Sequence, residues 1–286
     1  MHIKSVSRVA FWSLLRSLAI TTWGNARILR AFFALGVPPL FAPYRLLVLH
    51  KFGGKLRMNL NFGSRTIHIR PKSSDLHVLA QTFPSYFPRT HYEIIKNHYS
   101  RILDIGKVPI VLDAGAYTGL TSLLFCSTFP KSMVYAIEPS SENFRILQMN
   151  TRNETNIETI NAALGPIGKP LYLVDPNMGE WGYRADPIEL VEGGTPIETI
   201  QPTEILLKKE NSEPFICKLD IEGGERHLTE SDWSRILEFP VIVIEPHDWM
   251  MPGKHTSFGF FQAHSIFKAK RDLVIVGENL WSIAVN

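Results

Sequence analysis

The feature that most constrains the fold is a short apolar run that ends in an acid and continues into a glycine turn. Residues 110–112 are Ile, Val and Leu, Asp113 follows them, and Gly115 and Gly119 frame a turn before the apolar segment 120–129. A β-branched run, a glycine turn and a helical segment in this order are typical of the first unit of a doubly wound α/β sheet. Glycines at such a turn let a ligand approach the backbone, and the helix start beyond it presents free N–H groups.

A second acid, Glu138, ends the next apolar run, MVYAIEP. An acid at the end of the second strand commonly holds ribose hydroxyls in such a sheet. The dinucleotide fingerprint is G-x-G-x-x-G, whose middle glycine closes on a pyrophosphate, whereas here the order is D-x-G-x-x-x-G with Tyr117 inside the turn. A nucleoside ligand without phosphates, S-adenosylmethionine (SAM), fits this pattern better. We predict that Asp113 lies near its amino-acid end, that Gly115 to Gly119 line its methionine moiety, and that Glu138 binds its ribose. The alternative is a turn that only joins a buried strand to a helix.

The rest of the chain alternates between short apolar runs and helical patterns, which predicts a doubly wound, mostly parallel sheet. A strand at 65–70 and helices at 76–81 and 91–103 precede the sheet, and residues 165–200 are expected to form a hairpin or excursion beside it. Further strands are expected at 109–113, 133–138, 157–162, 215–219 and 241–245, helices at 119–128, 141–151 and 232–238, and a final strand pair at 272–285.

The N-terminal quarter differs in charge from the remainder. No Asp or Glu occurs before Asp75, although 12 of the 30 Lys and Arg residues lie in residues 1–74. The longest charge-free run, 31–44, is shorter than the roughly 20 apolar residues of a spanning helix and contains three prolines. Arg16 also interrupts any secretory signal. We therefore predict two parts, a basic, apolar extension at 1–60 and a SAM-binding domain at 61–286.

The extension has three interpretations. As an interfacial anchor, its apolar side chains enter the headgroup region and its arginines face anionic lipid. As an ordinary helical extension it packs on the domain, and its composition also suits an organellar transit peptide. The two cysteines, Cys126 and Cys217, lie in apolar runs and are expected to be buried free thiols of a reducing compartment. We expect a cytoplasmic protein that can attach to a membrane surface.

Acidic residues follow two further predicted strands. KLDIEGGE ends one strand and IEPHDW ends the next, so both groups are expected at the same edge of the sheet as the glycine turn. Asp220, Glu222, Glu245 and His247 are the residue types that take a proton from a hydroxyl acceptor. Three oxygens and a nitrogen also suit Mg²⁺ or Mn²⁺, with Asp220, Glu245 and His247 as the candidate metal ligands.

Each of these residues also has a purely structural interpretation. Asp220 can cap the helix that follows it, and Glu222 and Glu225 can be solvated acids of the first helical turn, which helix dipoles favour. His247 can be a loop histidine without a chemical role.

Six segments in this order resemble the FkbM-type family of SAM-dependent methyltransferases. They are IHIRPKSSDLHVL (67–79), VLDAGAYTG (111–119), YAIEPSSENFRILQMN (135–150), NAALG (161–165), FICKLDIEGGE (215–225) and VIEPH (243–247). The resemblance implies a class I methyltransferase (Rossmann-like) fold and usually O-methylation of a sugar, glycan or polyketide-type hydroxyl. It implies SAM-binding roles for Asp113, Gly115, Ala116, Gly119, Glu138 and Asn161. It also implies that Asp220, Glu222 and Glu225 are the acidic motif of the family. Tyr117 and Thr118 depart from the family pattern, and residues 1–60 lie outside the resemblance.

We therefore predict a SAM-dependent O-methyltransferase with a saccharide or lipid-linked glycan as acceptor. Asp220 is the first choice of proton acceptor or metal ligand, and Glu222 and His247 support it. The alternatives are an N-methyltransferase, which needs no strong base, and a non-catalytic adaptor of the same fold at a membrane surface. A nucleic-acid partner is disfavoured because the SAM-binding part is acidic and would repel a phosphate backbone. The sequence predicts no oligomeric state.

Overall fold

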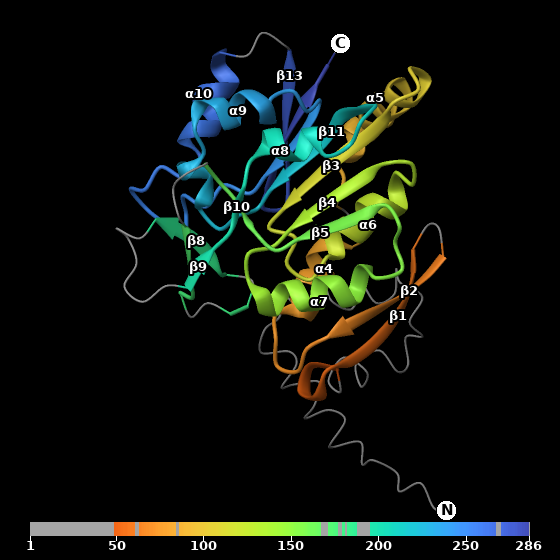
Figure 1. The fold of residues 1–286 in the computed structure, drawn as a ribbon, viewed down its shortest axis with the longest axis vertical. Coiled ribbons are helices and arrows are strands. Elements are labelled where there is room, and N and C mark those ends of the chain that lie inside the picture. The colour runs from red at the N-terminus through yellow and green to blue at the C-terminus, as the bar shows by residue number, and fades with distance from the viewer. Residues whose placement is uncertain are drawn as a thin grey trace, which may run out of the picture.

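The computed structural model describes most of the chain beyond residue 48 (Figure 1). The described residues are 49–60, 63–83, 86–166, 171–176, 179–180, 182–187, 195–266 and 270–285. Of the predicted membrane-surface extension at 1–60, residues 1–48 lie outside the described residues. Within the described ranges, no helix has the length and apolar character needed to cross a bilayer.

A seven-stranded sheet forms the centre of the molecule, in the order β13-β14-β12-β11-β3-β4-β5 (Figure 1). Its strands are β3 Val108–Ala114, β4 Met133–Ile137, β5 Ile157–Ile160, β11 Ser212–Leu219, β12 Val241–Ile244, β13 Arg271–Val276 and β14 Asn279–Ala284. Only β14 runs opposite to the other six. The chain runs outward from β3 through β4 and β5 and then returns to β11 on the other side of β3. This confirms the predicted doubly wound, mostly parallel sheet and the class I methyltransferase fold.

Helices cover both faces of this sheet, so its central strands are buried on both sides and read as continuous apolar runs. On one face lie α5 Tyr92–Asp104, α6 Leu120–Thr128 and α7 Ser141–Thr151. On the other lie α8 Pro202–Leu207, α9 Glu230–Ile236 and α10 Phe258–Ile266. Side chains alternate accordingly, since Val111 packs with the first group and Leu112 with the second. The glycine turn and the acidic segments leave the sheet at the carboxyl ends of its parallel strands.

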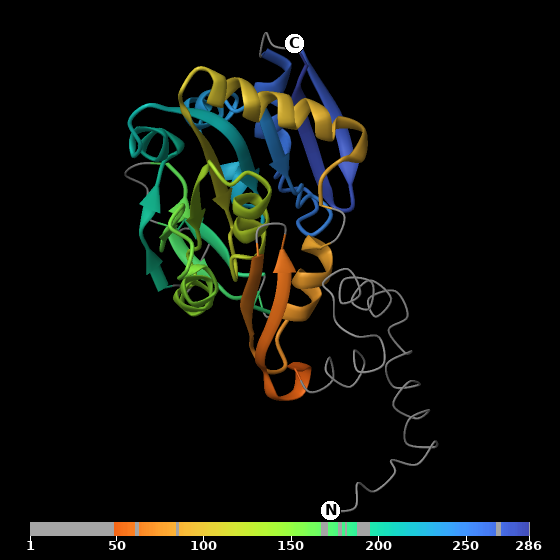
Figure 2. The same cartoon turned by 90° about the vertical axis from the view of Figure 1, so that its right-hand side faces the viewer.

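A separate hairpin and helix precede the sheet. Strand β1, Gly54–Leu60, pairs antiparallel with β2, Gly63–Ile69, and α4, Asp75–Thr82, follows. The hairpin lies beside α4 at one end of the molecule (Figure 2). Leu56, Ile67 and Leu79 share an apolar cluster with the first turn of α6. The predicted domain boundary at residue 60 therefore divides the hairpin, since β1 belongs to the same packed unit as β2.

The segment predicted as an excursion forms small sheets outside the central one. Strand β7, Leu171–Val174, lies between β8, Arg184–Pro187, and β9, Thr195–Ile197, and both pairings are antiparallel. Strand β10, Thr199–Ile200, pairs parallel with β6, Ala163–Leu164. The short helices η1, Arg89–His91, and η3, Gly224–His227, complete the described elements.

Most predicted elements agree with the structure to within a few residues, but β1, α8 and α10 were not predicted. Helix α8 has only six residues and is too short for a clear period. Helix α10 does not gather its polar residues on one face, which is the pattern that marks a surface helix. Both cysteines are buried and free, as predicted.

Candidate functional site

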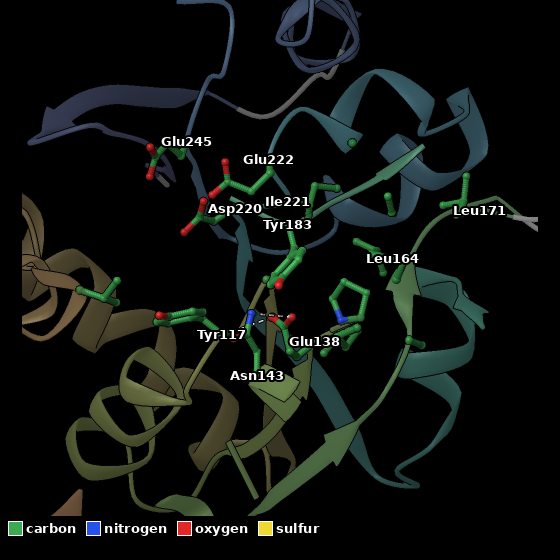
Figure 3. A pocket seen from close by; sticks show the side chains of 18 of the residues that line it. Tyr117, Glu138, Asn143, Leu164, Leu171, Tyr183, Asp220, Ile221, Glu222 and Glu245 are labelled. Carbon is green, nitrogen blue, oxygen red and sulfur yellow. Dashed lines mark hydrogen bonds between the residues drawn. The ribbon is translucent and has the colours of Figure 1, made fainter. Parts of the chain in front are cut away.

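A pocket opens at the carboxyl ends of β3, β4, β11 and β12, next to the point where the strand order reverses (Figure 3). Ligands of open α/β sheets bind at this place. The described lining comes from α4, the glycine turn, the ends of β4, β11 and β12, the small sheets, and the turn between β13 and β14. Of the sequence-predicted site residues, Gly115, Glu138, Asp220, Glu222 and Glu245 line this pocket.

Glu138 follows β4 directly, and its side chain is only 4% exposed. Its Oε2 accepts a hydrogen bond from the backbone N–H of Tyr117 at 2.9 Å, and its Oε1 accepts one from the N–H of Ser140 at 2.9 Å. The side-chain amide of Asn143 also donates to Oε1 at 3.4 Å (Figure 3). Burial raises the pKa of Glu138 to about 7, although the backbone hydrogen bonds oppose the rise. Since each carboxylate oxygen accepts about two hydrogen bonds, Oε2 retains capacity for a hydroxyl donor.

The two glycines of the turn are required by contacts within the protein. Both have positive φ, 76° at Gly115 and 82° at Gly119. A Cβ at Gly115 would lie 1.7 Å from the carbonyl oxygen of Asp220, and a Cβ at Gly119 would lie 2.6 Å from Leu147 Cδ1. Gly115 lines the pocket as predicted, whereas Gly119 is not among its described lining residues. Close packing between the turn, β11 and α7 therefore accounts for both glycines without any ligand.

Asp113 is fully buried and is not among the described lining residues of the pocket. Its Oδ2 accepts a 2.6 Å hydrogen bond from Ser122 Oγ, and its Oδ1 lies 3.3 Å from Lys218 Nζ. The same ammonium lies 3.1 Å from Asp220 Oδ2 and donates to the carbonyl oxygen of Gly115 at 3.0 Å. Burial raises the pKa of Asp113, and the charge of Lys218 opposes that rise. Asp113 therefore holds the lysine that links the glycine turn to Asp220.

Two other predicted SAM residues also lie outside the described lining. Ala116 is buried, and its N–H donates to the carbonyl oxygen of Ile137 at 2.9 Å. Asn161 is exposed, and its amide donates to the carbonyl oxygens of Glu138 at 2.8 Å and Pro139 at 3.2 Å. Both residues fix the backbone beside Glu138.

The acidic residues that follow β11 and β12 converge on His247. We call Asp220, Glu222, Glu225, Glu245 and His247 the acidic cluster. His247 Nε2 lies 3.4 Å from Glu222 Oε2, 3.8 Å from Asp220 Oδ1 and 3.9 Å from Glu245 Oε1, and Nδ1 lies 3.3 Å from Glu225 Oε1. Glu222 and Glu225 are buried, so they are not the solvated acids of the alternative interpretation, and His247 is buried as well. Asp220 caps no helix, because η3 begins at Gly224 and its N-cap residue is Gly223.

Burial and mutual repulsion disfavour simultaneous ionisation of the carboxyl groups in the acidic cluster. Burial raises the pKa of Glu222 to about 9, with the charges of Asp220 and Glu245 adding to the rise. Burial and Asp220 likewise raise the pKa of Glu245 to about 8. Burial alone would lower the pKa of His247, but Glu225, Glu222 and Asp220 raise it to about 10. The cluster therefore favours any additional positive charge.

Sequence reasoning missed Lys218 and a second network around Arg70. The carboxylate of Asp75 accepts hydrogen bonds from Arg70 Nη2 at 2.8 Å and from the Tyr117 hydroxyl at 2.7 Å. Arg70 Nη1 also donates to Asn143 Oδ1 at 2.8 Å, and Asn143 contacts Glu138. The segment before α4 is thereby tied to the pocket, and α4 itself supplies part of the lining. The signal was present in the sequence as an arginine and an acid five residues apart beside an apolar run.

The chain is similar to several known proteins. The chain is 25% identical over 150 residues to the hexuronic acid methyltransferase AglP of Haloferax volcanii, covering 50% of this chain and 58% of that protein. It therefore spans less than two thirds of that relative. Similar solved structures include a SAM-dependent methyltransferase from Aquifex aeolicus, with 14% identity, a TM-score of 0.31, and coverage of 69% of this chain and 94% of that one. A precorrin-6y C5,15-methyltransferase from Geobacter metallireducens has 12% identity, a TM-score of 0.34, and coverage of 66% and 85%.

The family model of the methyltransferase FkbM domain matches residues 113–264. This range is more than half of the chain, and it extends from the acid that ends β3 through the glycine turn, Glu138 and the acidic cluster into α10. The chain belongs to the FkbM family of SAM-dependent methyltransferases.

Proposed function

We propose that this methyltransferase is an O-methyltransferase that acts on a hydroxyl of a saccharide, glycan or related natural product. The observation that carries the proposal is the pocket that has Glu138 on one side and the acidic cluster on the other. Glu138 is a buried carboxylate with free acceptor capacity, which suits the two hydroxyls of a ribose. The acidic cluster offers the groups that a hydroxyl acceptor needs for its proton.

The residues that would touch SAM are a subset of those predicted. Glu138 would accept its ribose hydroxyls, and the backbone at Gly115 would lie against its methionine moiety, since both residues line the pocket. Asp113, Ala116, Gly119 and Asn161 would act through the turn and the backbone beside Glu138. SAM supplies a methyl group on a sulfonium sulfur. The acceptor oxygen would bond to the methyl carbon, and the electrons of the broken C–S bond would remain on sulfur.

Asp220 is the group we assign to the proton of the acceptor hydroxyl. Its side chain is 26% exposed and lines the pocket, and Lys218 fixes its Oδ2, so Oδ1 is available either to the proton of the acceptor or to a metal ion that binds the acceptor. Glu222 and His247 would position Asp220 and take part in the charge balance around it. The same carboxylates and the imidazole also form a donor set that suits Mg²⁺ or Mn²⁺, whose chemistry here is to lower the pKa of a bound hydroxyl.

The charge of the pocket favours an acceptor without a negative charge. Its described lining contains five carboxyl side chains and neither Lys nor Arg. The relative from Haloferax volcanii is named for a hexuronic acid, which carries a carboxylate, and such an acceptor would meet like charge at each carboxyl group of the lining that is ionised. Trp249, 64% exposed, and Tyr183 line the same pocket and offer apolar faces to a neutral sugar ring.

The test is calorimetric titration of the purified full chain with SAM and with S-adenosylhomocysteine. We expect saturable binding of both, weakened tenfold or more by Glu138→Ala. Glu158→Ala is the matched control, because Glu158 lies on β5 and is not among the described lining residues. Absence of binding to correctly folded wild type would overturn the assignment and favour a non-catalytic adaptor of this fold.

A separate variant, Asp220→Asn, tests whether the atom that receives the methyl group is oxygen or nitrogen. An O-methyltransferase should lose about 10²–10⁴-fold in turnover, because general-base catalysis contributes that much. An amine that reacts in its neutral form needs no base, so unchanged turnover would identify an N-methyltransferase.

For residues 1–60 we propose attachment to an anionic membrane surface, supported by the absence of acids and by the nine Lys and Arg residues in this range. Sedimentation with phosphatidylserine vesicles should bring down the full chain at low salt and release it at high salt. Equal sedimentation with neutral vesicles would contradict this attachment.

A further inference from the structure

The acidic cluster has the geometry of a divalent metal site. Strands β11 and β12 are neighbours with Leu219 opposite Ile244, so Asp220 and Glu245 leave the sheet side by side. One ligand atom each of Asp220, Glu222 and His247 lies within 4.8 Å of the others. Figure 3 shows the carboxyl groups of Asp220, Glu222 and Glu245 together at one rim of the pocket. Two ligand atoms at right angles on a metal with bonds of about 2.2 Å lie about 3 Å apart. The distances from His247 Nε2 to Glu222 Oε2, 3.4 Å, and to Asp220 Oδ1, 3.8 Å, are close to this value.

Two atoms that face this place lack hydrogen-bond partners. Within the described part of the chain, neither His247 Nε2 nor Glu222 Oε2 has one, although both atoms are buried. His247 is wholly buried, so water does not solvate its ring. Buried polar groups are nearly always satisfied by a partner, and an exception calls for an explanation such as an ion. A cation between Nε2 and the carboxylates would satisfy both atoms together.

The other ring nitrogen of His247 has the surroundings of a metal-binding histidine. Nδ1 lies 3.3 Å from Oε1 of Glu225, a buried carboxylate that also accepts the backbone N–H of Ile221 at 3.2 Å. Metal-ligating histidines usually present one nitrogen to the ion and the other to a carboxylate or carbonyl, which fixes the ring. Glu225 therefore directs Nε2 toward Asp220 and Glu222.

The backbone and the neighbouring lysine are consistent with this arrangement. Glu222 has φ 54°, a left-handed conformation that is uncommon for a residue with a side chain and collects at functional sites. Lys218 contacts Oδ2 of Asp220, whereas Oδ1 is the oxygen nearer His247. The lysine and an ion would thus share the carboxylate without competing for one oxygen.

We infer that Asp220, Glu222 and His247 bind one divalent cation, with Glu245 within reach as a fourth ligand and Glu225 as the positioning residue of the histidine. Two carboxylates suit Mg²⁺ and Mn²⁺, and the imidazole shifts the preference toward Mn²⁺. The ion site stands on the cluster alone. Its use in methyl transfer, as a Lewis acid beside the acceptor hydroxyl, rests on the proposed function.

The test is titration of the metal-free full chain with MnCl₂, followed by calorimetry and by the electron paramagnetic resonance signal of free Mn²⁺. We expect saturation at one Mn²⁺ per chain. Asp220→Asn and Glu222→Gln should each weaken binding at least tenfold, and Glu225→Gln should weaken it about 10–100-fold through the histidine. Glu278→Gln is the matched control, since it removes a carboxylate from the same pocket outside the acidic cluster, and binding should then change less than twofold.

The outcomes separate the ion site from the methyltransferase proposal. Wild type that binds SAM but shows no saturable Mn²⁺ binding overturns the ion site and leaves the proposed function in place. Mn²⁺ binding that Asp220→Asn and Glu222→Gln leave unchanged also overturns it, because the ion would then lie elsewhere. Mn²⁺ binding without SAM binding overturns the proposed function and leaves the ion site. Circular dichroism of each variant checks its fold, and Asp220, as the more exposed ligand, is the variant least expected to disturb folding.

Discussion

The two sides of the pocket differ in how the fold satisfies their buried carboxylates. On the side of the glycine turn, the carboxylate of Glu138 receives N–H groups from Tyr117 and Ser140, which the chain itself supplies. In the acidic cluster, Glu222 Oε2 and His247 Nε2 have no hydrogen-bond partner among the described residues. The carboxylate of Glu138 is therefore satisfied as folded, whereas we propose that a cation completes the acidic cluster.

This difference is consistent with one pocket that binds two ligands, a cofactor beside Glu138 and an acceptor beside the acidic cluster, as the proposed function requires. Backbone donors hold Glu138 rigidly at no cost in side-chain freedom, which suits a cofactor that binds in the same way in every cycle. The acidic cluster instead gathers carboxyl groups at one rim of the pocket, where the proposed function has the acceptor enter and give up its proton. Lys218 joins the two sides, because its ammonium contacts Asp113, Asp220 and the carbonyl of Gly115.

The largest effect should come from removing this link with Lys218→Met. The substitution keeps the bulk of the side chain but leaves Asp113 as a buried carboxylate without its cation. Breaking a buried ion pair by removing one partner costs roughly 3–5 kcal/mol, and we expect a loss of that order in the free energy of unfolding in urea. Lys208→Met is the control, since Lys208 pairs with Glu158 at the surface and should cost less than about 1 kcal/mol. Equal losses in the two variants would mean that Lys218 does not hold the two sides together.

Tyr117→Phe tests the network behind the Glu138 side. The variant removes the 2.7 Å hydrogen bond from the hydroxyl to Asp75 and keeps the ring in place. A hydrogen bond to a charged group contributes about 1.5–3 kcal/mol, so the free energy of unfolding should fall by that amount. Tyr172→Phe on β7 should have little effect. A loss no larger than that of the control would show that Arg70 alone satisfies Asp75.

The pH dependence of SAM binding tests whether Glu138 acts as an ionised acceptor. Its folded pKa is about 7 and its ordinary value is 4.5, so its contribution to stability is full below pH 4.5 and is lost as the pH rises through 7. Hydroxyl donors favour the ionised form, so SAM affinity should rise about tenfold between pH 6 and pH 8. Calorimetric titration at both values measures this rise, and Glu138→Gln should abolish it. A rise that persists in Glu138→Gln would have to come from another group.

The cofactor side was more predictable from the sequence than the acidic cluster was. A strand, a glycine turn and an acid after the next strand are patterns of neighbouring residues. What they predict does not depend on how distant parts of the chain pack. The residues of the acidic cluster were also predictable, because each follows a strand of the same parallel sheet. Their mutual distances were not, since the positive φ of Glu222 and the burial of His247 depend on how two loops pack.

The missed residues share a physical cause. Lys218 stands in an apolar strand, where sequence reasoning expects no charge, and only the fold reveals the two acids that make its burial tolerable. Asp75 received no site role because Tyr117, which donates to it, lies 42 residues away in the sequence and is brought to it only by the fold. Strand β1 has a basic, glycine-containing sequence and is recognised only by its pairing with β2.

The smallest effect is expected for Asn161→Ala, which separates contact with the cofactor from support of its site. The family resemblance implies a role for Asn161 at SAM, but its exposed amide donates to the carbonyl oxygens of Glu138 and Pro139. Losing neutral hydrogen bonds at an exposed position should cost about 0.5–1 kcal/mol of unfolding free energy. SAM affinity should then change less than about threefold, against the tenfold or greater loss expected for Glu138→Ala. A tenfold loss of affinity in Asn161→Ala with unchanged stability would instead mean that the amide turns to the ligand, and the Glu138 side would then not be complete before SAM binds.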